Sequence, residues 1–376
     1  MEAIDSLNLT QQLAIQANET LKELLEFEDS IEYVNISSPS DTIFAALEFS
    51  KIFHYVTAVF GIIGNLLVIA IYLKFSRIRT VTNTYLFNIA LSDLLYVITV
   101  PVFLISIWNN SWPFGDFVCK ILLSKGAIHR FASSLFLLVV VADTYISLLK
   151  PTLSHRIYKN PINIKVITGL VWVVCALSVG PVFYHASTYT VPNSNINHCD
   201  LFWTGPSREH YIWFTIVLAF LIPTTIKILL ALPIVYQLSG AAPIEANGQY
   251  TAFAERNRRS AHLILTITLF HIIFWLPLWV SLISINLMPY TEQPDTSSIL
   301  FHMISGCIGM ANTVLNPILY IKLSPDFRNG LHQLITFIPE SIIAKSPIDR
   351  SEVMNERAVP KTDCVTKFDS AISQTN

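Results

Sequence analysis

Long apolar stretches recur along the whole 376-residue chain, and they constrain its fold more than any other feature. Four of them carry little or no charge: "IFHYVTAVFGIIGNLLVIAIYL", "VITGLVWVVCALSVGPVFY", "YIWFTIVLAFLIPTTIKILLAL" and "LILTITLFHIIFWLPLWVSLI". Each is close to or above the roughly 20 residues that cross a bilayer as a helix. Three weaker stretches, at about 82–107, 118–149 and 298–321, carry polar or charged residues, as helices that face a bundle interior do. We therefore predict an all-α membrane protein, a bundle of seven transmembrane helices.

Charged side chains are scarce, which supports a membrane location. Asp, Glu, Lys and Arg make up 13% of the residues, and the mean hydropathy is +0.52. Soluble domains carry about 25% charged residues. The sequence contains no metal-spaced set of His and Cys, no nucleophile elbow and no phosphate-binding loop. It also contains no internal repeat of the kind found in many transporters. These patterns argue against an enzyme, a metal or nucleic-acid site and a transporter.

Basic residues are distributed unevenly between alternate loops. They gather after the first and third predicted spans and before the sixth, and the loops on the other side carry few. These residues are Lys74, Arg77, Arg79, Lys150, Arg156, Lys159, Arg256, Arg258 and Arg259. By the positive-inside rule these loops are cytoplasmic. The sequence therefore predicts a multi-pass plasma-membrane protein with its N-terminus outside.

The N-terminal segment fits that orientation. Residues 1–50 contain glycosylation sequons at Asn8, Asn18 and Asn35. The first residues have neither a basic nor an apolar region of the kind that forms a cleavable signal peptide. We expect an extracellular, glycosylated N-terminal segment.

The rest of the chain divides into three further regions. Residues 51–321 form the predicted bundle. Residues 322–337 repeat apolar side chains on one helical face, which predicts a short amphipathic helix on the inner membrane surface after the seventh span. Residues 338–376 are polar and are predicted to form a disordered cytoplasmic tail.

Two of the five cysteines are predicted to pair. Cys119 lies at the outer start of the third span, and Cys199 lies in the long outer loop before the fifth. Both face an oxidising space, where thiols pair. Cys175 and Cys307 fall inside spans and suit small packing residues. A Cys119–Cys199 disulfide is the prediction.

Several short motifs occur in a fixed order, about one per predicted span. They are "GNLLV" with Asn65, "NIALSDLL" with Asp93, "WPFGDFVC" with Cys119, "ADTY" with Asp143, Trp172, Pro223, "FWLP" with Trp275 and Pro277, and "LNPILY" with Asn316, Pro317 and Tyr320. In this order they resemble the rhodopsin-like (class A) G-protein-coupled receptors over about residues 52–337. The stretch around Cys119 and the sixth and seventh spans look most similar to the somatostatin, opioid, galanin and allatostatin-C neuropeptide receptors.

The resemblance implies a cell-surface receptor for an extracellular neuropeptide that transmits ligand binding to a heterotrimeric G protein. It also implies membrane lipid, arrestin and receptor kinases as partners, the last two acting on the Ser- and Thr-bearing tail. It implies no nucleic acid, no catalytic residue and no cofactor other than a sodium ion at Asp93. A proton-sensing receptor is a competing interpretation because His129, His271 and His302 can titrate, but the peptide-receptor motifs outweigh it.

The sequence departs from the family pattern at the parts that serve G-protein coupling. The family carries an arginine after Asp143, where this chain has Thr144 followed by Tyr145. Ala231 replaces a tyrosine of span five, and His271 replaces a phenylalanine of span six. The switch residues that keep the pattern are Pro277, Pro317 and Tyr320. Two interpretations stay open: a variant with compensating contacts, or a receptor-fold protein with weak or absent coupling that acts as a decoy or dimer partner.

Asp93 is predicted to lie near the middle of the membrane, where a charged side chain needs a partner. In the family this acid binds sodium with polar groups of spans three and seven, and Ser133, Asn312 and Asn316 occupy the matching positions. The alternative is a hydrogen-bonded polar hub without an ion. Arg130 lies at about the same depth, with two interpretations. It forms an ion pair with Asp93 that displaces sodium, which we favour, or it receives an acidic group of the ligand.

Gly126 occupies the position where amine, opioid and somatostatin receptors carry an aspartate for a ligand ammonium. The anchor for a cationic ligand is therefore missing, and Arg130 lies one helical turn deeper. The predicted ligand-binding residues are Phe103, Gly126, Arg130, Thr215, Trp275, Leu278, Trp279, Leu282 and His302. An aromatic stripe is usually core, but in a bundle that is open to the outside it predicts a pocket.

Overall fold

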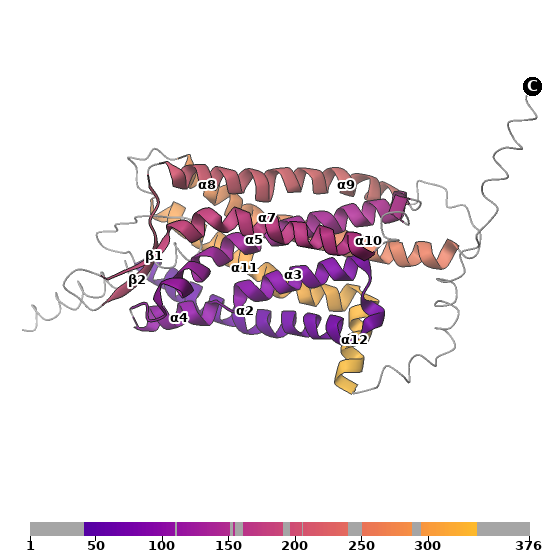
Figure 1. Ribbon diagram of the computed structural model, residues 1–376, viewed down its shortest axis with the longest axis horizontal. Helices are drawn as coiled ribbons and strands as arrows, with labels where there is room; N and C mark the ends of the chain where they lie inside the picture. Colours follow the sequence, from indigo (N-terminus) through magenta and orange to yellow (C-terminus); the bar gives the residue numbers. More distant parts are fainter. Residues whose placement is uncertain are drawn as a thin grey trace, which may run out of the picture. The chain divides into compact units, whose positions relative to one another are not determined.

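The computed structural model describes residues 41–109, 111–150, 153–154, 161–190, 196–204, 206–239, 250–287 and 295–336. Within these ranges, seven helical segments are long and apolar enough to cross a membrane, which confirms the predicted bundle (Figure 1). The segments are Thr42–Lys74, Val81–Asn109, Gly115–Leu149, Ile162–His185, Ser207–Leu238, Arg258–Asn286 and Thr296–Leu323. The sequons at Asn8, Asn18 and Asn35 and the tail 338–376 lie outside the described residues.

Helix α2 (Asp41–Lys74) forms the first span and begins inside the segment predicted to lie outside the membrane. Its 34 residues correspond to roughly 51 Å of helix, whereas the hydrocarbon core is roughly 30 Å thick. One end of α2 therefore extends beyond the apolar layer. Gly64 lies where α2 meets α11 (Thr296–Leu323), and a Cβ at this position would lie 3.0 Å from the Pro317 side chain. This close approach of the two helices favours a glycine.

Two helices, α3 (Val81–Val97) and α4 (Val100–Asn109), together form the second span. The interruption lies at Ile98 and Thr99, and Pro101 is the second residue of the helix that follows. A proline has no backbone N–H, and its ring clashes with the carbonyl four residues earlier. The sequence therefore breaks this span into two helices without ending it.

Helix α5 (Gly115–Leu149) is the third span and the centre of the bundle. It packs against α3, α7 (Pro161–His185), α9 (Ile222–Leu238) and α10 (Tyr250–Asn286). Because α5 touches helices on several sides, polar residues at successive positions along it face different neighbours. This arrangement decides which partner each candidate site residue meets.

The fifth span changes its helical winding along its length. It runs from α8 (Ser207–Thr215) through a π-helical segment, η2 (Ile216–Leu221), into α9. Pro223 follows that segment directly and cannot donate a backbone hydrogen bond to the preceding turn. Prolines and π-segments are common causes of such local changes in helix geometry.

Side-chain hydrogen bonds tie the spans together in the interior. Asn65 on α2 donates from Nδ2 to the carbonyl of Thr313 on α11 at 3.0 Å. Trp172 on α7 donates from Nε1 to Oδ1 of Asn88 on α3 at 2.9 Å. These bonds use residues that lie within or beside the sequence motifs, so the motifs fix the packing of the helices.

The two strands lie together at one end of the bundle. β1 (Ala186–Thr190) and β2 (Asn197–Leu201) pair antiparallel, with Thr188 opposite Cys199. We call this the hairpin end (Figure 1). The opposite end, where α5 carries Asp143 and the short 3-10 helix η1 (Ser76–Ile78) connects α2 to α3, is called the Asp143 end.

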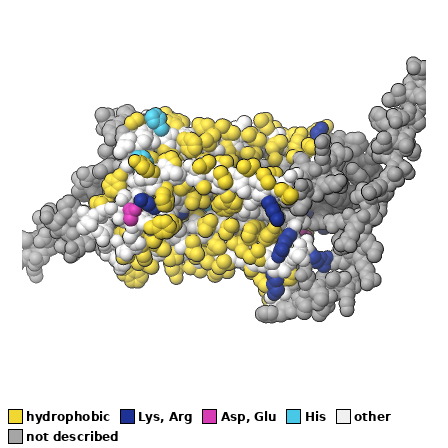
Figure 2. All heavy atoms as spheres, viewed as in Figure 1, with side chains coloured by type: hydrophobic (Ala, Val, Ile, Leu, Met, Phe, Trp, Pro, Cys, Tyr) yellow, Lys and Arg dark blue, Asp and Glu magenta, His cyan; other side chains and the backbone are white. Residues whose placement is uncertain are grey.

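The outer surface of the bundle is apolar. Figure 2 shows hydrophobic side chains across the middle of the visible face, with Lys and Arg towards its ends. Ile63, Leu170 and Leu229 are 59–61% exposed, a high value for large apolar side chains. A lipid environment accounts for this exposure because hydrocarbon chains solvate apolar side chains.

A further helix follows the seventh span, as predicted. α12 (Pro325–Thr336) begins after Ser324, three positions later than the predicted start at 322. Phe327 is fully buried, and its ring centroid lies 5.9 Å from that of Tyr320. Asn83 Nδ2 donates to Oδ2 of Asp326 at 3.0 Å. The position of α12 on the membrane surface stays a prediction.

Candidate functional site

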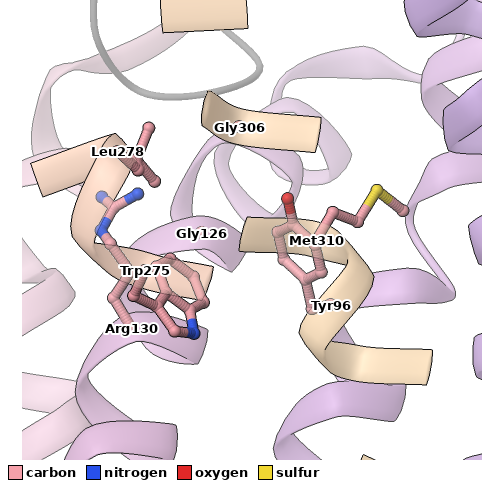
Figure 3. A pocket seen from close by; sticks show the side chains of 7 residues that line it. All are labelled: Tyr96, Gly126, Arg130, Trp275, Leu278, Gly306 and Met310. Carbon is pink, nitrogen blue, oxygen red and sulfur yellow. The ribbon is translucent and has the colours of Figure 1, made fainter. Parts of the chain in front are cut away.

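A small cavity lies among α3, α5, α10 and α11 (Figure 3). It is lined by Tyr96, Gly126, Arg130, Trp275, Leu278, Gly306 and Met310. The space open to the centre of a water-sized sphere is about 20 Å³, which is enough for about one water molecule. Four predicted ligand-binding residues are brought together here: Gly126, Arg130, Trp275 and Leu278. In this conformation the cavity is therefore too small for a group larger than a water molecule.

Arg130 gives this cavity its charge. Among the seven lining residues, all of them described, it alone is charged. Its side chain is 7% exposed, and Figure 3 shows the guanidinium beside Trp275 and Leu278. Gly126, which has no side chain, lies one helical turn before it on α5. The wall therefore presents a cation where the sequence lacks the family's carboxylate.

The other five predicted ligand-binding residues are buried but do not line this cavity. They are Phe103, Thr215, Trp279, Leu282 and His302. Trp279 stacks on Phe220 with ring centroids 5.1 Å apart. Nδ1 of His302 lies 2.8 Å from Oγ of Ser281. In this conformation these side chains form core contacts, and their contact with a ligand stays a prediction.

Gly306 and Met310 complete the cavity, although the sequence does not single them out. They lie four residues apart on α11 and therefore share one helical face. Gly306 leaves space, and Met310 supplies an adaptable apolar wall. Neither residue type is a signal by itself, so only the packing of α11 against α3 and α5 reveals them.

Asp93 is completely buried and is held by two nitrogen donors. His129 Nε2 lies 2.7 Å from Oδ1, and Asn316 Nδ2 donates to Oδ2 at 2.8 Å. In the tautomer that carries its proton on Nε2, His129 donates this hydrogen bond to the Asp93 carboxylate. The polar hub predicted around Asp93 thus joins α3, α5 and α11, with His129 as a member that the prediction did not include.

The predicted ion pair between Arg130 and Asp93 is corrected by this geometry. In the described part of the chain the Asp93 carboxylate is bonded by His129 and Asn316, and Arg130 lines the cavity instead. Neighbouring residues on a helix point about 100° apart. His129 therefore faces α3 while Arg130 faces the space between α10 and α11. The contact of Arg130 with an acidic ligand group stays a prediction.

Aromatic rings connect His129 to the cavity. Its ring stacks on Tyr96 with centroids 4.7 Å apart and lies 5.4 Å from Trp275. Tyr96 and Trp275 both line the cavity. Two residues of the cavity wall therefore contact His129, which in turn contacts Asp93.

The other two predicted hub residues, Ser133 and Asn312, have different surroundings. Ser133 Oγ lies 3.5 Å from Nδ1 of His271, so it faces α10. Asn312 is fully buried, and neither of its side-chain polar atoms has a hydrogen-bond partner within the described residues. Of the three predicted hub residues, the structure therefore brings only Asn316 into hydrogen-bond contact with Asp93 within the described residues.

Lys227 is a buried cation whose role the sequence analysis does not anticipate. It lies on α9, is fully buried, and donates from Nζ to Oγ of Ser134 on α5 at 3.3 Å. A lone lysine in an otherwise apolar run is the signal that could have identified it. Such residues inside membrane spans are rare and usually face the bundle interior.

Asp143 is bonded across to the second span. Thr82 on α3 donates from Oγ1 to Oδ2 of Asp143 at 2.8 Å, and Ser147 Oγ lies 3.5 Å from Oδ1. Thr144 is buried and donates to the carbonyl of Val140 on its own helix at 2.8 Å. The acid thus holds α3 to α5 at the Asp143 end, while the neighbouring threonine uses its hydroxyl within α5.

The other predicted switch residues lie in the helices that the sequence predicted for them. Pro277 lies inside α10 and Pro317 inside α11. Tyr320 is fully buried, and Tyr145 and Ala231 are partly exposed. Their role in coupling stays a prediction, since the structure describes one conformation.

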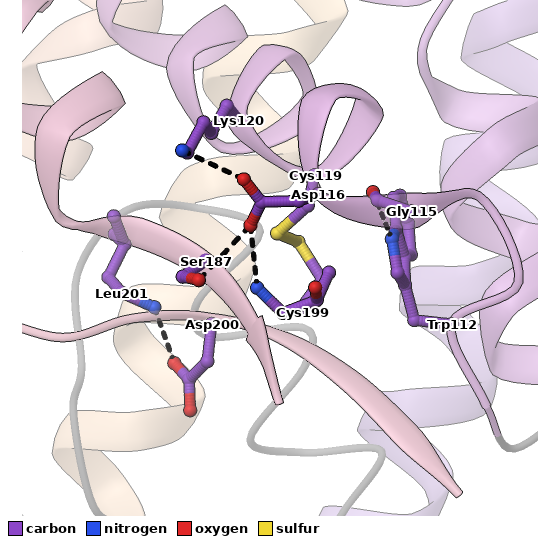
Figure 4. The surroundings of a disulfide bond; sticks show 10 residues. Trp112, Gly115, Asp116, Cys119, Lys120, Ser187, Cys199, Asp200 and Leu201 are labelled. Carbon is purple, nitrogen blue, oxygen red and sulfur yellow. Dashed lines mark hydrogen bonds and ion pairs between the residues drawn. A yellow bond between two sulfur atoms is a disulfide. The ribbon is translucent and has the colours of Figure 1, made fainter. Parts of the chain in front are cut away.

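At the hairpin end, Cys119 and Cys199 form the predicted disulfide, with Cα atoms 5.5 Å apart (Figure 4). Asp116, one turn before Cys119, adds a second attachment. It accepts hydrogen bonds from Ser187 Oγ at 3.1 Å and from the Thr188 amide at 3.0 Å. It also pairs with Lys120, whose Nζ lies 2.8 Å from its Oδ2. The hairpin is thus bound to the start of α5 by one covalent and several polar contacts.

Comparison with known proteins agrees with this architecture. A sequence model described as "7 transmembrane receptor (rhodopsin family)" matches residues 64–320. Somatostatin receptor type 1 of Rattus norvegicus is 27% identical over 298 residues, covering 78% of this chain and 73% of that receptor. Somatostatin receptor type 2 of Mus musculus is 26% identical over 291 residues, covering 77% of each chain. Somatostatin receptor type 5 of Rattus norvegicus is 28% identical over 284 residues, covering 73% and 74%. The chain therefore belongs to the rhodopsin family of seven-transmembrane receptors.

Proposed function

We propose that this protein is a plasma-membrane receptor for an extracellular peptide and that it signals to a heterotrimeric G protein. The observation that carries the proposal is the family match over residues 64–320, together with relatives named as somatostatin receptors. The hairpin, fixed to α5 by the Cys119–Cys199 disulfide, supports a ligand entrance at the hairpin end. In this proposal the hairpin end and the N-terminus face outside, as the basic loops predict.

The chemistry of the cavity suggests one feature of the ligand. Gly126 provides no carboxylate for an ammonium group, and Arg130 places a guanidinium in the wall. Guanidinium groups bind carboxylates through two parallel hydrogen bonds. We therefore expect the peptide to insert an acidic group, with Trp275 and Leu278 contacting its apolar part.

The Asp143 end is the proposed surface for the G protein. Arg258 and Arg259 lie near the start of the sixth span and are exposed, so they can supply cationic contacts in place of the missing arginine at Thr144. The comparisons give no support to the alternative of a decoy without coupling. Arrestin and receptor kinases acting on the tail, lipid contacts of α12 and glycosylation at the sequons complete the proposal.

A peptide screen with two readouts tests this function. Cells that express the full chain are exposed to a panel of synthetic neuropeptides and to a panel of biogenic amines, and G-protein activation and arrestin recruitment are both measured. Each peptide is made with a free C-terminal carboxylate and as the amide. We expect saturable activation by a peptide; activation by an amine alone would contradict the peptide assignment.

Variants at Arg130 then test the contact with an acidic group. Arg130→Lys keeps the charge, and Arg130→Gln removes it at similar size. We expect Arg130→Gln to lose more agonist potency than Arg130→Lys, and to lose it only for peptides that carry the acidic group. Equal potency in wild type and Arg130→Gln would leave the receptor assignment intact and refute the acidic contact.

A further inference from the structure

The carboxylate of Asp93 has a protein-supplied N–H group at each of its two oxygens. His129 Nε2 lies 2.7 Å from Oδ1, and Asn316 Nδ2 lies 2.8 Å from Oδ2. The Asp93 and His129 side chains are 0% and 1% exposed. Both contacts have the distance of strong hydrogen bonds. Each oxygen of this buried acid is therefore already in one short contact with a side-chain nitrogen.

These contacts do not fit a sodium ion at Asp93. Hard cations are bound by oxygen atoms whose lone pairs point at the ion. Here the atoms next to the carboxylate are nitrogens that direct hydrogens toward it. Ser133 Oγ faces His271, which leaves Asn312 as the predicted hub member with an oxygen that is not engaged within the described residues. The two side chains that bond to Asp93 therefore present N–H donors to its carboxylate, whereas a cation needs oxygen ligands.

Two basic residues of α5 near His129 also disfavour a cation at Asp93. Lys125 and Arg130 lie on the same helix as His129, and their side chains are 4% and 7% exposed. Arg130 lines the cavity that adjoins Tyr96 and Trp275, the two rings in contact with His129. Like charges repel strongly in the low-dielectric interior.

The packing holds His129 in this position. Its ring lies between Tyr96, with ring centroids 4.7 Å apart, and Trp275, with ring centroids 5.4 Å apart. A ring with neighbours on two sides and a charged acceptor at its Nε2 has little freedom to rotate away. The packing of the bundle thus fixes the contact between His129 and Asp93.

We propose that His129 takes the place of a metal ion at Asp93, so that this receptor is insensitive to sodium. The imidazole N–H stabilises the buried carboxylate that a cation would otherwise neutralise. This inference is independent of which ligand the receptor binds and of whether it couples to a G protein. It concerns a metal site that the family resemblance implies and that these residues exclude.

Thermal unfolding of the purified full-length chain tests the proposal without a ligand. The unfolding midpoint is measured in sodium chloride and in choline chloride at equal ionic strength, for wild type, Asp93→Asn and His129→Ser. We expect wild type and Asp93→Asn to show the same midpoint in both salts. His129→Ser replaces the donor ring with a small oxygen ligand, and we expect its midpoint to be roughly 2–4 °C higher in sodium chloride.

Two controls make the result specific. The double variant His129→Ser with Asp93→Asn should lose the sodium response, because the carboxylate is gone. His54→Ser removes another fully buried histidine, one that bonds to Ser50 on its own helix, and should respond to sodium as wild type does.

Two results would overturn the proposal. The first is a sodium-specific rise in the wild-type midpoint that Asp93→Asn abolishes. The second is a folded His129→Ser variant with no sodium response, which would show that His129 is not what excludes the ion. If His129→Ser does not fold, the comparison of wild type with Asp93→Asn decides alone.

Discussion

Lys227→Met is expected to stabilise the protein, although it removes a charged side chain that forms a hydrogen bond. Lys227 is fully buried, and within the described residues no carboxylate lies at ion-pair distance from it. Its Nζ donates to Ser134 Oγ at 3.3 Å, which is long for such a bond. A hydrogen bond to a charged group contributes about 1.5–3 kcal/mol, and the long distance favours the low end.

The cost of burying the ammonium group is larger than the contribution of this hydrogen bond. Removing an ammonium group from water costs several kcal/mol even after the protein relaxes. Methionine has a similar length and fills irregular space without this cost. Replacing a buried ion pair by apolar side chains of similar volume is often neutral or stabilising by about 1–4 kcal/mol, and we expect a gain of that order for Lys227→Met because this lysine lacks even a paired carboxylate within the described residues.

Thermal unfolding of the detergent-solubilised receptor measures this gain. About 1 kcal/mol moves the midpoint by roughly 2–4 °C for a domain of this order of size, so a rise of several degrees is expected. Lys227→Ala is the matched control: it removes the same charge but leaves a cavity, and should be less stable than Lys227→Met. A fall of the midpoint in Lys227→Met would refute the reasoning, because it would mean that the ammonium group has a stabilising partner.

Cys119→Ser or Cys199→Ser should abolish surface expression or ligand binding, because the disulfide links residues 80 apart and closing such a loop contributes about 4–5 kcal/mol in the chain-entropy treatment; normal surface staining with normal binding would contradict this. Asp116→Ala should remove the polar contacts of β1 with the start of α5, while the disulfide still holds β2, and should reduce peptide potency with little loss of expression, as a concentration–response curve at matched surface levels would show. Thr144→Arg should raise maximal G-protein activation with little change in ligand affinity, since the new cation can pair with Asp143 at rest and meet the G protein on opening; equal maxima at matched expression would show that Thr144 is a compensated variant.

The spans and the disulfide could be predicted because each depends on local sequence. A bilayer of fixed thickness selects apolar runs of a certain length, and the loop positions of Cys119 and Cys199 follow from the order of those runs. The ends of the helices are harder to predict from the sequence. α2 begins at Asp41 because a helix continues beyond the apolar layer, and the sequence from 41 to 50 is too polar to be recognised as part of a span.

The polar interior could be predicted only in part. The sequence predicted Arg130 at the depth of Asp93 and favoured it as the partner of that acid, but the partner is the neighbouring residue His129. A rotation of about 100° separates the two side chains, and the crossing of α3 and α5 selects His129. The cavity residues Gly126, Arg130, Trp275 and Leu278 were predicted as part of a larger set. The rest of that set packs in the core because the helices are closer together here than an open pocket requires.

The central claim is that this chain is a peptide receptor that couples to a G protein despite Thr144. Its most direct test is nucleotide exchange on heterotrimeric G proteins in membranes from cells that express the wild-type chain, with the peptide panel as stimulus and membranes lacking the chain as control. The account predicts a saturable, peptide-dependent increase in GTP-analogue binding with at least one class of G protein. Saturable peptide binding to the receptor without nucleotide exchange in any G-protein class would contradict it.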